Sequence, residues 1–174
     1  TWRSDWRDKQ GIVLAAFADA AESESALDLP RAFNLALQAG GRTLIKELPP
    51  KPDLASSLLV DGRSFDFDGR RAIGRVEQYA EEPGGTTTVV IDGSAKYSRL
   101  GLQSARRLVW VDRSPPNGTP MLWSTLDQVR ASTEHVYSWQ INLGTIGNAA
   151  IEVSARAGQR PPTFLARWSD GTGL

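Results

Sequence analysis

The stretch Thr86-Thr87-Thr88-Val89-Val90-Ile91 is β-branched at every position and ends at Asp92-Gly93. β-branched side chains favour strands, because their restricted χ1 angle suits a pleated surface better than a helix. Asp-Gly is a turn pair, since both residues tolerate the backbone angles that tight turns need. This stretch therefore predicts a strand followed by a turn.

Strand-like runs of the same kind recur on both sides of it. Phe33, Leu35 and Leu37 alternate with other residues before Gly40-Gly41, and residues 43–47 return after that turn, which predicts a hairpin. The remaining runs cover residues 12–17, 58–60, 73–80, 107–113, 121–126, 135–143, 149–155 and 164–168.

The spacing of these runs, about 8–12 residues with turn residues between them, is typical of a sandwich or barrel. We expect an all-β fold, an antiparallel β-sandwich of many short strands with little helix. Only residues 23–29 indicate a short helical turn, which Pro30 would end. We expect residues 1–174 to form a single sandwich domain that is a fragment or module of a longer protein.

Composition narrows the classes of function. The chain has 174 residues, 40% of them hydrophobic and 23% charged, and a formal net charge of +0, so neither disorder nor nucleic-acid binding is favoured. The absence of Cys and the single His argue against a zinc site built from Cys and His ligands, and no cofactor is predicted. No segment approaches the ~20 apolar residues of a membrane span.

The single histidine, His135, shares one face of a predicted strand with Tyr137. A histidine and a tyrosine on one face are candidates for the base and the acid in proton abstraction from a sugar acid. The same pattern is typical of a structural histidine beside a packing tyrosine. The carboxylates of Asp61, Asp66, Asp68 and Asp92 all border glycine turns, and turn formation explains them without catalysis.

Arginines and tryptophans are the candidate binding residues. Arg70, Arg71 and Arg75 cluster, and guanidinium groups suit carboxylates and sulfates, although neighbouring glutamates also indicate a solvated, charge-balanced rim. Aromatic faces suit sugar rings, but the tryptophans of the central strands, Trp110, Trp123 and Trp139, are typical of core anchors. The tryptophans near the chain ends, Trp2, Trp6 and Trp168, lie among charges, which predicts an exposed surface for a sugar or a partner.

Residues 32–144 resemble the β-sheet domain of heparinase II/III-like polysaccharide lyases. The matching pieces are the hairpin of residues 32–45, the Val60-Asp61-Gly62 turn, the Asp92 to Tyr97 segment with its following Arg107-led strand, and residues 135–142. The resemblance implies a β-sandwich that packs on a helical toroid domain and acts on an acidic polysaccharide. It also implies a secreted or periplasmic location.

The chain departs from that family at its histidine motifs. Residues 23–28 read Ser-Glu-Ser-Ala-Leu-Asp and residues 55–57 read Ala-Ser-Ser, where the family carries the histidines used for zinc binding or catalysis. We therefore expect a non-catalytic module that frames a polysaccharide cleft, and the isolated chain to be inactive. Two alternatives remain: a free-standing carbohydrate-binding or protein-interaction sandwich, and a lyase that acts by β-elimination through Tyr137 and His135.

Overall fold

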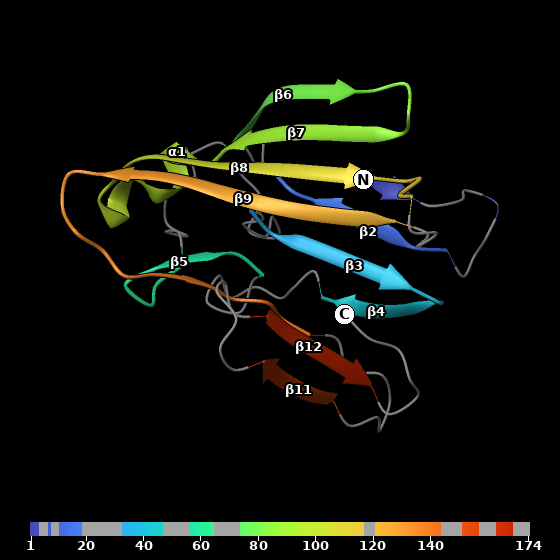
Figure 1. The fold of residues 1–174 in the computed structure, drawn as a ribbon. Coiled ribbons are helices and arrows are strands. Elements are labelled where there is room, and N and C mark those ends of the chain that lie inside the picture. The colour runs from blue at the N-terminus through green and yellow to red at the C-terminus, as the bar shows by residue number, and fades with distance from the viewer. Residues whose placement is uncertain are drawn as a thin grey trace, which may run out of the picture.

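The computed structural model describes residues 1–3, 7, 11–18, 33–46, 56–64, 74–116 and 121–143, and the backbone of two further strands between residues 151 and 168. Strands in antiparallel sheets dominate these residues, with one short α-helix (Figure 1). The all-β antiparallel fold expected from the sequence is confirmed. No helix among the described residues is long and apolar enough to cross a membrane.

One layer of the sandwich is a four-stranded sheet in the order β1-β2-β3-β4. Its strands are β1 (Trp2–Arg3), β2 (Val13–Ala16), β3 (Leu35–Ala39) and β4 (Arg42–Ile45). The β3–β4 hairpin turns at Gly40 and Gly41, whose φ angles are +58° and +72°. Two positive φ angles match the right-handed twist of the flanking strands, and glycine adopts them without a Cβ clash.

The other layer is a second four-stranded sheet in the order β6-β7-β8-β9. Its strands are β6 (Arg75–Glu81), β7 (Thr86–Asp92), β8 (Leu102–Asp112) and β9 (Leu122–Ala131). One hydrophobic cluster joins the two layers, since it contains Leu14 and Leu37 from the first sheet and Ile91 and Val109 from the second. These side chains are almost entirely removed from water, and their burial drives the two sheets together.

Two small pairings complete the described strands. β5 (Leu58–Val60) pairs with β10 (Tyr137–Trp139), and β11 (Ile151–Arg156) pairs with β12 (Thr163–Trp168). The segment after β10 reaches the edge of β4 through an isolated bridge between Ile45 and Leu143. One bridge therefore links the segment after the β5–β10 pair to the edge of the first layer.

The helical elements differ from those that the sequence predicts. Helix α1 (Ser94–Tyr97) and a 3₁₀ turn over Ser98–Leu100 follow β7, where only a turn is expected, and residues 23–29 lie outside the described residues. Asp92 Oδ1 accepts hydrogen bonds from Ser94 N at 2.9 Å and Ser94 Oγ at 2.5 Å, which turns the chain into the helix. Tyr97 is fully buried and donates its hydroxyl to Leu58 O at 2.9 Å, so α1 ties β5 to the second sheet.

The central tryptophans are less buried than core anchors. Trp123 is half-buried and packs against the core, but Trp110 is half-buried on the opposite face of β8 from Val109 and Val111. Trp139 is 38% exposed. The prediction that these tryptophans anchor the core is therefore wrong for Trp110 and Trp139. Alternation along β8 turns Trp110 to the outer face, and an arginine occupies the buried space beside Trp139.

That arginine, Arg107, occupies the inward face of β8 and is fully buried. It faces Asp127 of β9 across the ladder, and its Nε and Nη2 donate to the two carboxylate oxygens at 2.6 and 2.5 Å. Nη1 donates to the carbonyl oxygen of Phe33, while the guanidinium lies 4.9 Å from the ring centroids of Phe33 and Trp139. The buried charge is thus paired, hydrogen-bonded and placed between two aromatic faces.

We predict that Asp127→Ala lowers the free energy of unfolding by about 3–5 kcal/mol, because it leaves the Arg107 guanidinium buried without its counter-charge. Arg106→Ala is the comparison variant. Arg106 precedes Arg107 in β8 and lies on the opposite face, where its side chain is 51% exposed in an ion pair with Glu77. Its loss should lower the free energy of unfolding by less than about 1 kcal/mol. Urea denaturation of the two variants and the wild type measures both values. Equal losses in the two variants would contradict the assignment of Asp127 as the counter-charge of the buried Arg107 guanidinium.

Candidate functional site

The clearest candidate site is a shallow groove between β9 and β10. It has a volume of about 400 Å³ and is lined by Leu58, Thr125, Leu126, Asp127, Tyr137, Ser138 and Trp139. β9 pairs only with β8 among the described strands, and β10 only with β5, so the groove lies where two sheet edges meet. Leu126, Tyr137 and Trp139 are 54%, 40% and 38% exposed, which is high for large apolar side chains.

Asp127 and Arg107 hold the Trp139 side chain in place. Its Nε1 donates to Asp127 Oδ2 at 2.8 Å, and the Arg107 guanidinium lies 4.9 Å from its ring centroid. Asp127 is itself fixed by its two hydrogen bonds from Arg107. The indole is therefore a preorganised surface, since little side-chain freedom remains to be lost when a ligand packs against it.

Tyr137 and His135 continue from Trp139 along the chain at two-residue spacing. The ring centroids of His135 and Tyr137 are 6.2 Å apart, so the structure brings the two sequence-predicted residues together. His135 Nδ1 lies 2.7 Å from Asp61 Oδ2, and its Nε2 lies 3.1 Å from Thr133 Oγ1. Both ring nitrogens thus have partners within the chain, and the His135 side chain is only 12% exposed.

Asp61 occupies the turn after β5 in a left-handed conformation, with φ of +51°. Its Oδ1 accepts the backbone N–H of Val136 at 2.9 Å, so the turn and the start of β10 are joined through one carboxylate. The hydrogen bond with His135 lowers the pKa of the Asp61 carboxyl from its ordinary value of 3.8, and the Val136 amide lowers it further. Asp61 is more than a turn residue, because its side chain orients His135.

The predicted arginine site is separate from this groove. Arg75 lies on β6, at the opposite edge of the second sheet from β9, and pairs with Glu77 at 3.3 Å and with Asp92 at 3.2 Å. Arg106 pairs with the same Glu77 at 3.0 Å. In the described part of this region the arginines thus belong to a charge-balanced rim. Arg70 and Arg71 lie outside the described residues.

The predicted exposure of the terminal tryptophans is wrong for Trp2. Its side chain is buried at 8% exposure, because β1 pairs with β2 and carries the indole into the core cluster. Trp6 lies outside the described residues, and the structure describes only the backbone of Trp168, in β12. Of the predicted tryptophan set, none is shown at an exposed surface.

Sequence reasoning missed the Arg107–Asp127–Trp139 cluster as a unit. Its signal was present: Arg107 shares the parity of Ala105, Val109 and Val111, so alternation places a charge on the buried face. A buried charge demands a partner of opposite sign, and the antiparallel strand that follows supplies Asp127. The link to Trp139 depends on the meeting of two sheets, which local patterns do not specify.

Within the described ranges, no three His, Cys, Asp or Glu side chains come together as a metal site. No protein-family model and no curated protein matches this chain.

We predict that Asp61 contributes stability only when it is ionised. Because its pKa is lower in the folded state, this contribution is present above the unfolded value of 3.8 and is lost as the pH falls through the lower folded pKa. Between about pH 5 and pH 3 the wild type should therefore lose more stability than Asp61→Asn, in which asparagine tolerates the positive φ. Urea denaturation across this range measures the difference, and identical pH profiles would contradict the prediction.

Proposed function

We propose that this chain is a non-catalytic β-sandwich module of a heparinase II/III-like polysaccharide lyase, secreted or periplasmic, whose β9–β10 groove faces an acidic polysaccharide. The observation that carries the proposal is the pair of exposed aromatic rings on β10, with Trp139 fixed by Asp127 and Arg107. A helical toroid domain, in the same or another chain, forms the opposite wall of the cleft.

Aromatic rings at two-residue spacing suit a sugar chain. Tyr137 and Trp139 lie on one face of a strand, and successive same-face residues are about 6.6 Å apart, close to the length of one sugar unit. Each ring offers an apolar face to sugar C–H groups, while the Tyr137 hydroxyl can exchange hydrogen bonds with sugar hydroxyls. Ligand sites commonly combine such apolar walls with a few placed polar groups.

The surroundings of His135 support a binding role over catalysis. A general base needs a free nitrogen within hydrogen-bond reach of the proton that it removes. Both nitrogens of His135 lie within hydrogen-bond distance of Asp61 and Thr133, and its side chain is mostly buried. His135 therefore joins the start of β10 to the turn at Asp61.

One observation favours the catalytic alternative. A carboxylate that holds one nitrogen of a histidine can orient the other as a base, and Asp61 holds His135 in this way 6.2 Å from Tyr137. Release of Thr133 from Nε2 would complete this arrangement. An enzyme of this kind would raise the unsaturated-uronate absorbance from alginate, hyaluronan or heparan sulfate, whereas a binding module would not.

We predict that oligosaccharides of these acidic polymers shift the tryptophan fluorescence of the protein and release no unsaturated product. Tyr137→Ala and Trp139→Ala should each weaken binding about tenfold, because each removes one stacking face. Trp110→Phe, on the outer face of β8, is the matched control and should bind as the wild type. Binding that survives both groove substitutions would refute the placement of the site.

The same titration separates the remaining alternatives. Equal affinity for neutral and acidic oligosaccharides would favour a free-standing carbohydrate-binding sandwich. Product formation that is lost in both His135→Ala and Tyr137→Phe, with the β-sheet circular dichroism spectrum intact, would establish the lyase. No binding to any oligosaccharide would overturn the proposal.

A further inference from the structure

The last strand of the second sheet, β9, has one edge that no described strand covers. Among the described strands β9 pairs only with β8, so it forms one margin of the sheet and β6 forms the other (Figure 1). Every second residue of an edge strand turns its backbone N–H and C=O away from the sheet, where another strand can bind them. β9 is ten residues long, about 33 Å, and keeps one unbroken register from Leu122 to Arg130.

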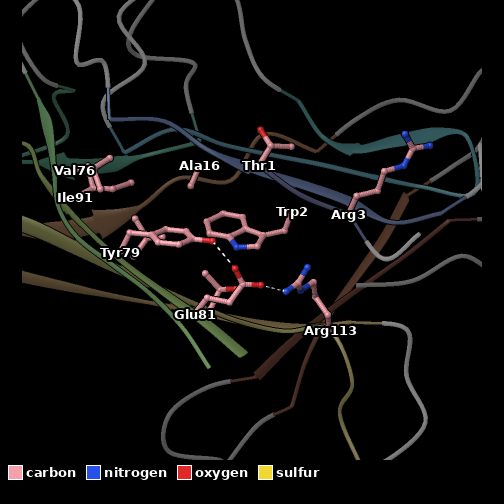
Figure 2. A pocket seen from close by; sticks show the side chains of 11 residues that line it. Thr1, Trp2, Arg3, Ala16, Val76, Tyr79, Glu81, Ile91 and Arg113 are labelled. Carbon is pink, nitrogen blue, oxygen red and sulfur yellow. Dashed lines mark hydrogen bonds and ion pairs between the residues drawn. The ribbon is translucent and has the colours of Figure 1, made fainter. Parts of the chain in front are cut away.

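The edge at β6 is built differently, in a way that discourages pairing. Its register with β7 shifts near its start, and it carries charges of both signs. Its Glu81 carboxylate accepts the Tyr79 hydroxyl at 3.1 Å and pairs with Arg113, as Figure 2 shows. Bulges and charged side chains commonly protect edge strands. β9 has neither proline nor lysine, and Arg107 already neutralises its one carboxylate, that of Asp127.

A row of apolar side chains ends at the β9 edge. Leu122 and Leu126 of β9 are 46% and 54% exposed. The register places Leu126 opposite Leu108 and Leu108 opposite Val90, so the row crosses three strands on the outer face of the sheet. An apolar surface that runs out to an unpaired strand edge favours association with another chain.

We propose that β9 pairs with the β9 of a second copy of this chain, antiparallel and with Leu126 opposite its own counterpart. A two-fold axis at Leu126 aligns residues 122–130 with the same residues in reverse order, which uses nearly the whole strand. Both copies then contribute the same surface, as in most homodimers. The pairing joins the two four-stranded sheets into one of eight strands, and the two apolar rows meet at the axis.

The sequence of β9 is complementary to itself in this register. Leu122 lies opposite Arg130, whose alkyl stem can cover it, and Ser124 lies opposite Gln128. No like charges stand opposite each other. Moving the axis by one residue to Asp127 would place two carboxylates opposite each other, which is unfavourable. Charge therefore selects the register centred on the leucine.

The pairing rests on the β9 edge and not on the proposed sugar binding. The β9–β10 groove borders this edge at residues 125–127, so a paired copy would lie over it. An acidic oligosaccharide that binds the groove should therefore shift the equilibrium toward the monomer. An oligosaccharide that does not bind leaves the dimer unchanged, so the two proposals fail separately.

Sedimentation equilibrium of the whole chain without sugar measures the association. We expect the mass to rise to that of two chains, and no further, between about 1 and 200 µM, a range suited to a small interface. Leu126→Lys removes the leucine contact and places like charges at the axis, so it should weaken the dimer at least about tenfold. Gln78→Lys adds the same charge to the same cross-strand row at the β6 edge, and should have no effect. Both positions are exposed, and circular dichroism checks that both variants fold.

A single introduced cysteine tests the register, because the chain has no cysteine of its own. Residues directly opposite each other in an antiparallel pair have Cα atoms about 4.5–5.5 Å apart, which a disulfide can span. Leu126→Cys should therefore give a covalent dimer under mild oxidation that a reductant reverses. Gln78→Cys, also exposed, should remain monomeric under the same conditions.

A monomer at every concentration would overturn the proposal, whether another segment of the chain covers the β9 edge or nothing does. So would a dimer that is as stable in Leu126→Lys as in the wild type, or growth beyond the dimer. Equal cross-linking through Leu126→Cys and Gln78→Cys would also overturn it.

Discussion

A fully buried guanidinium, that of Arg107, is the constraint on which the rest of this structure depends. Removing an unpaired charge from water is too costly for a domain of ordinary stability, so every neighbour of Arg107 must compensate it. Asp127 supplies the counter-charge from β9, and Phe33 supplies a carbonyl oxygen and an aromatic face from the residues before β3. These partners belong to both layers, so satisfying one side chain fixes how the two layers sit against each other.

The same cluster shapes the surface. Asp127 Oδ2 accepts hydrogen bonds from both Arg107 Nη2 and Trp139 Nε1. This shared acceptor holds the Trp139 indole at the point where β9 and β10 meet. Asp61 acts in parallel at the start of β10, where it holds His135 and the Val136 amide. The carboxylates of Asp61 and Asp127 therefore fix the two ends of the exposed aromatic row, which consists of Tyr137 and Trp139. A row held in this way loses little freedom on binding, which is what a platform for a sugar chain requires.

The elements that the sequence predicts well are those set by local chemistry. β7 follows from its β-branched run and its Asp-Gly end, and the β3–β4 hairpin follows from Gly40-Gly41. The long strand β9 is only half predicted, because Leu122 and Leu126 are apolar yet face outward and so obscure the alternation. Helix α1 depends on the Asp92–Ser94 hydrogen bonds, which replace a simple turn by a helical one.

The functional surface is predicted less well, for a physical reason. His135 and Tyr137 share a face as their spacing indicates, but the roles of Asp61 and Thr133 beside His135 arise from tertiary contacts. Trp2 was expected at the surface because charged residues surround it in the sequence, whereas the pairing of β1 with β2 buries it. Exposure is decided by which strands pair, and pairing at the chain's start is not encoded by neighbouring residues.

A double-mutant cycle of Arg107→Met and Asp127→Leu, with the free energy of unfolding as readout, measures how strongly the two side chains depend on each other. Each single variant leaves one buried charge alone and should be strongly destabilised, while the double variant replaces the pair by apolar side chains of similar size. We predict a favourable coupling of at least about 2 kcal/mol, with the double variant more stable than the sum of the single losses implies. Losses that add to within about 0.5 kcal/mol would show that Arg107 and Asp127 act independently, so that the buried guanidinium does not depend on Asp127.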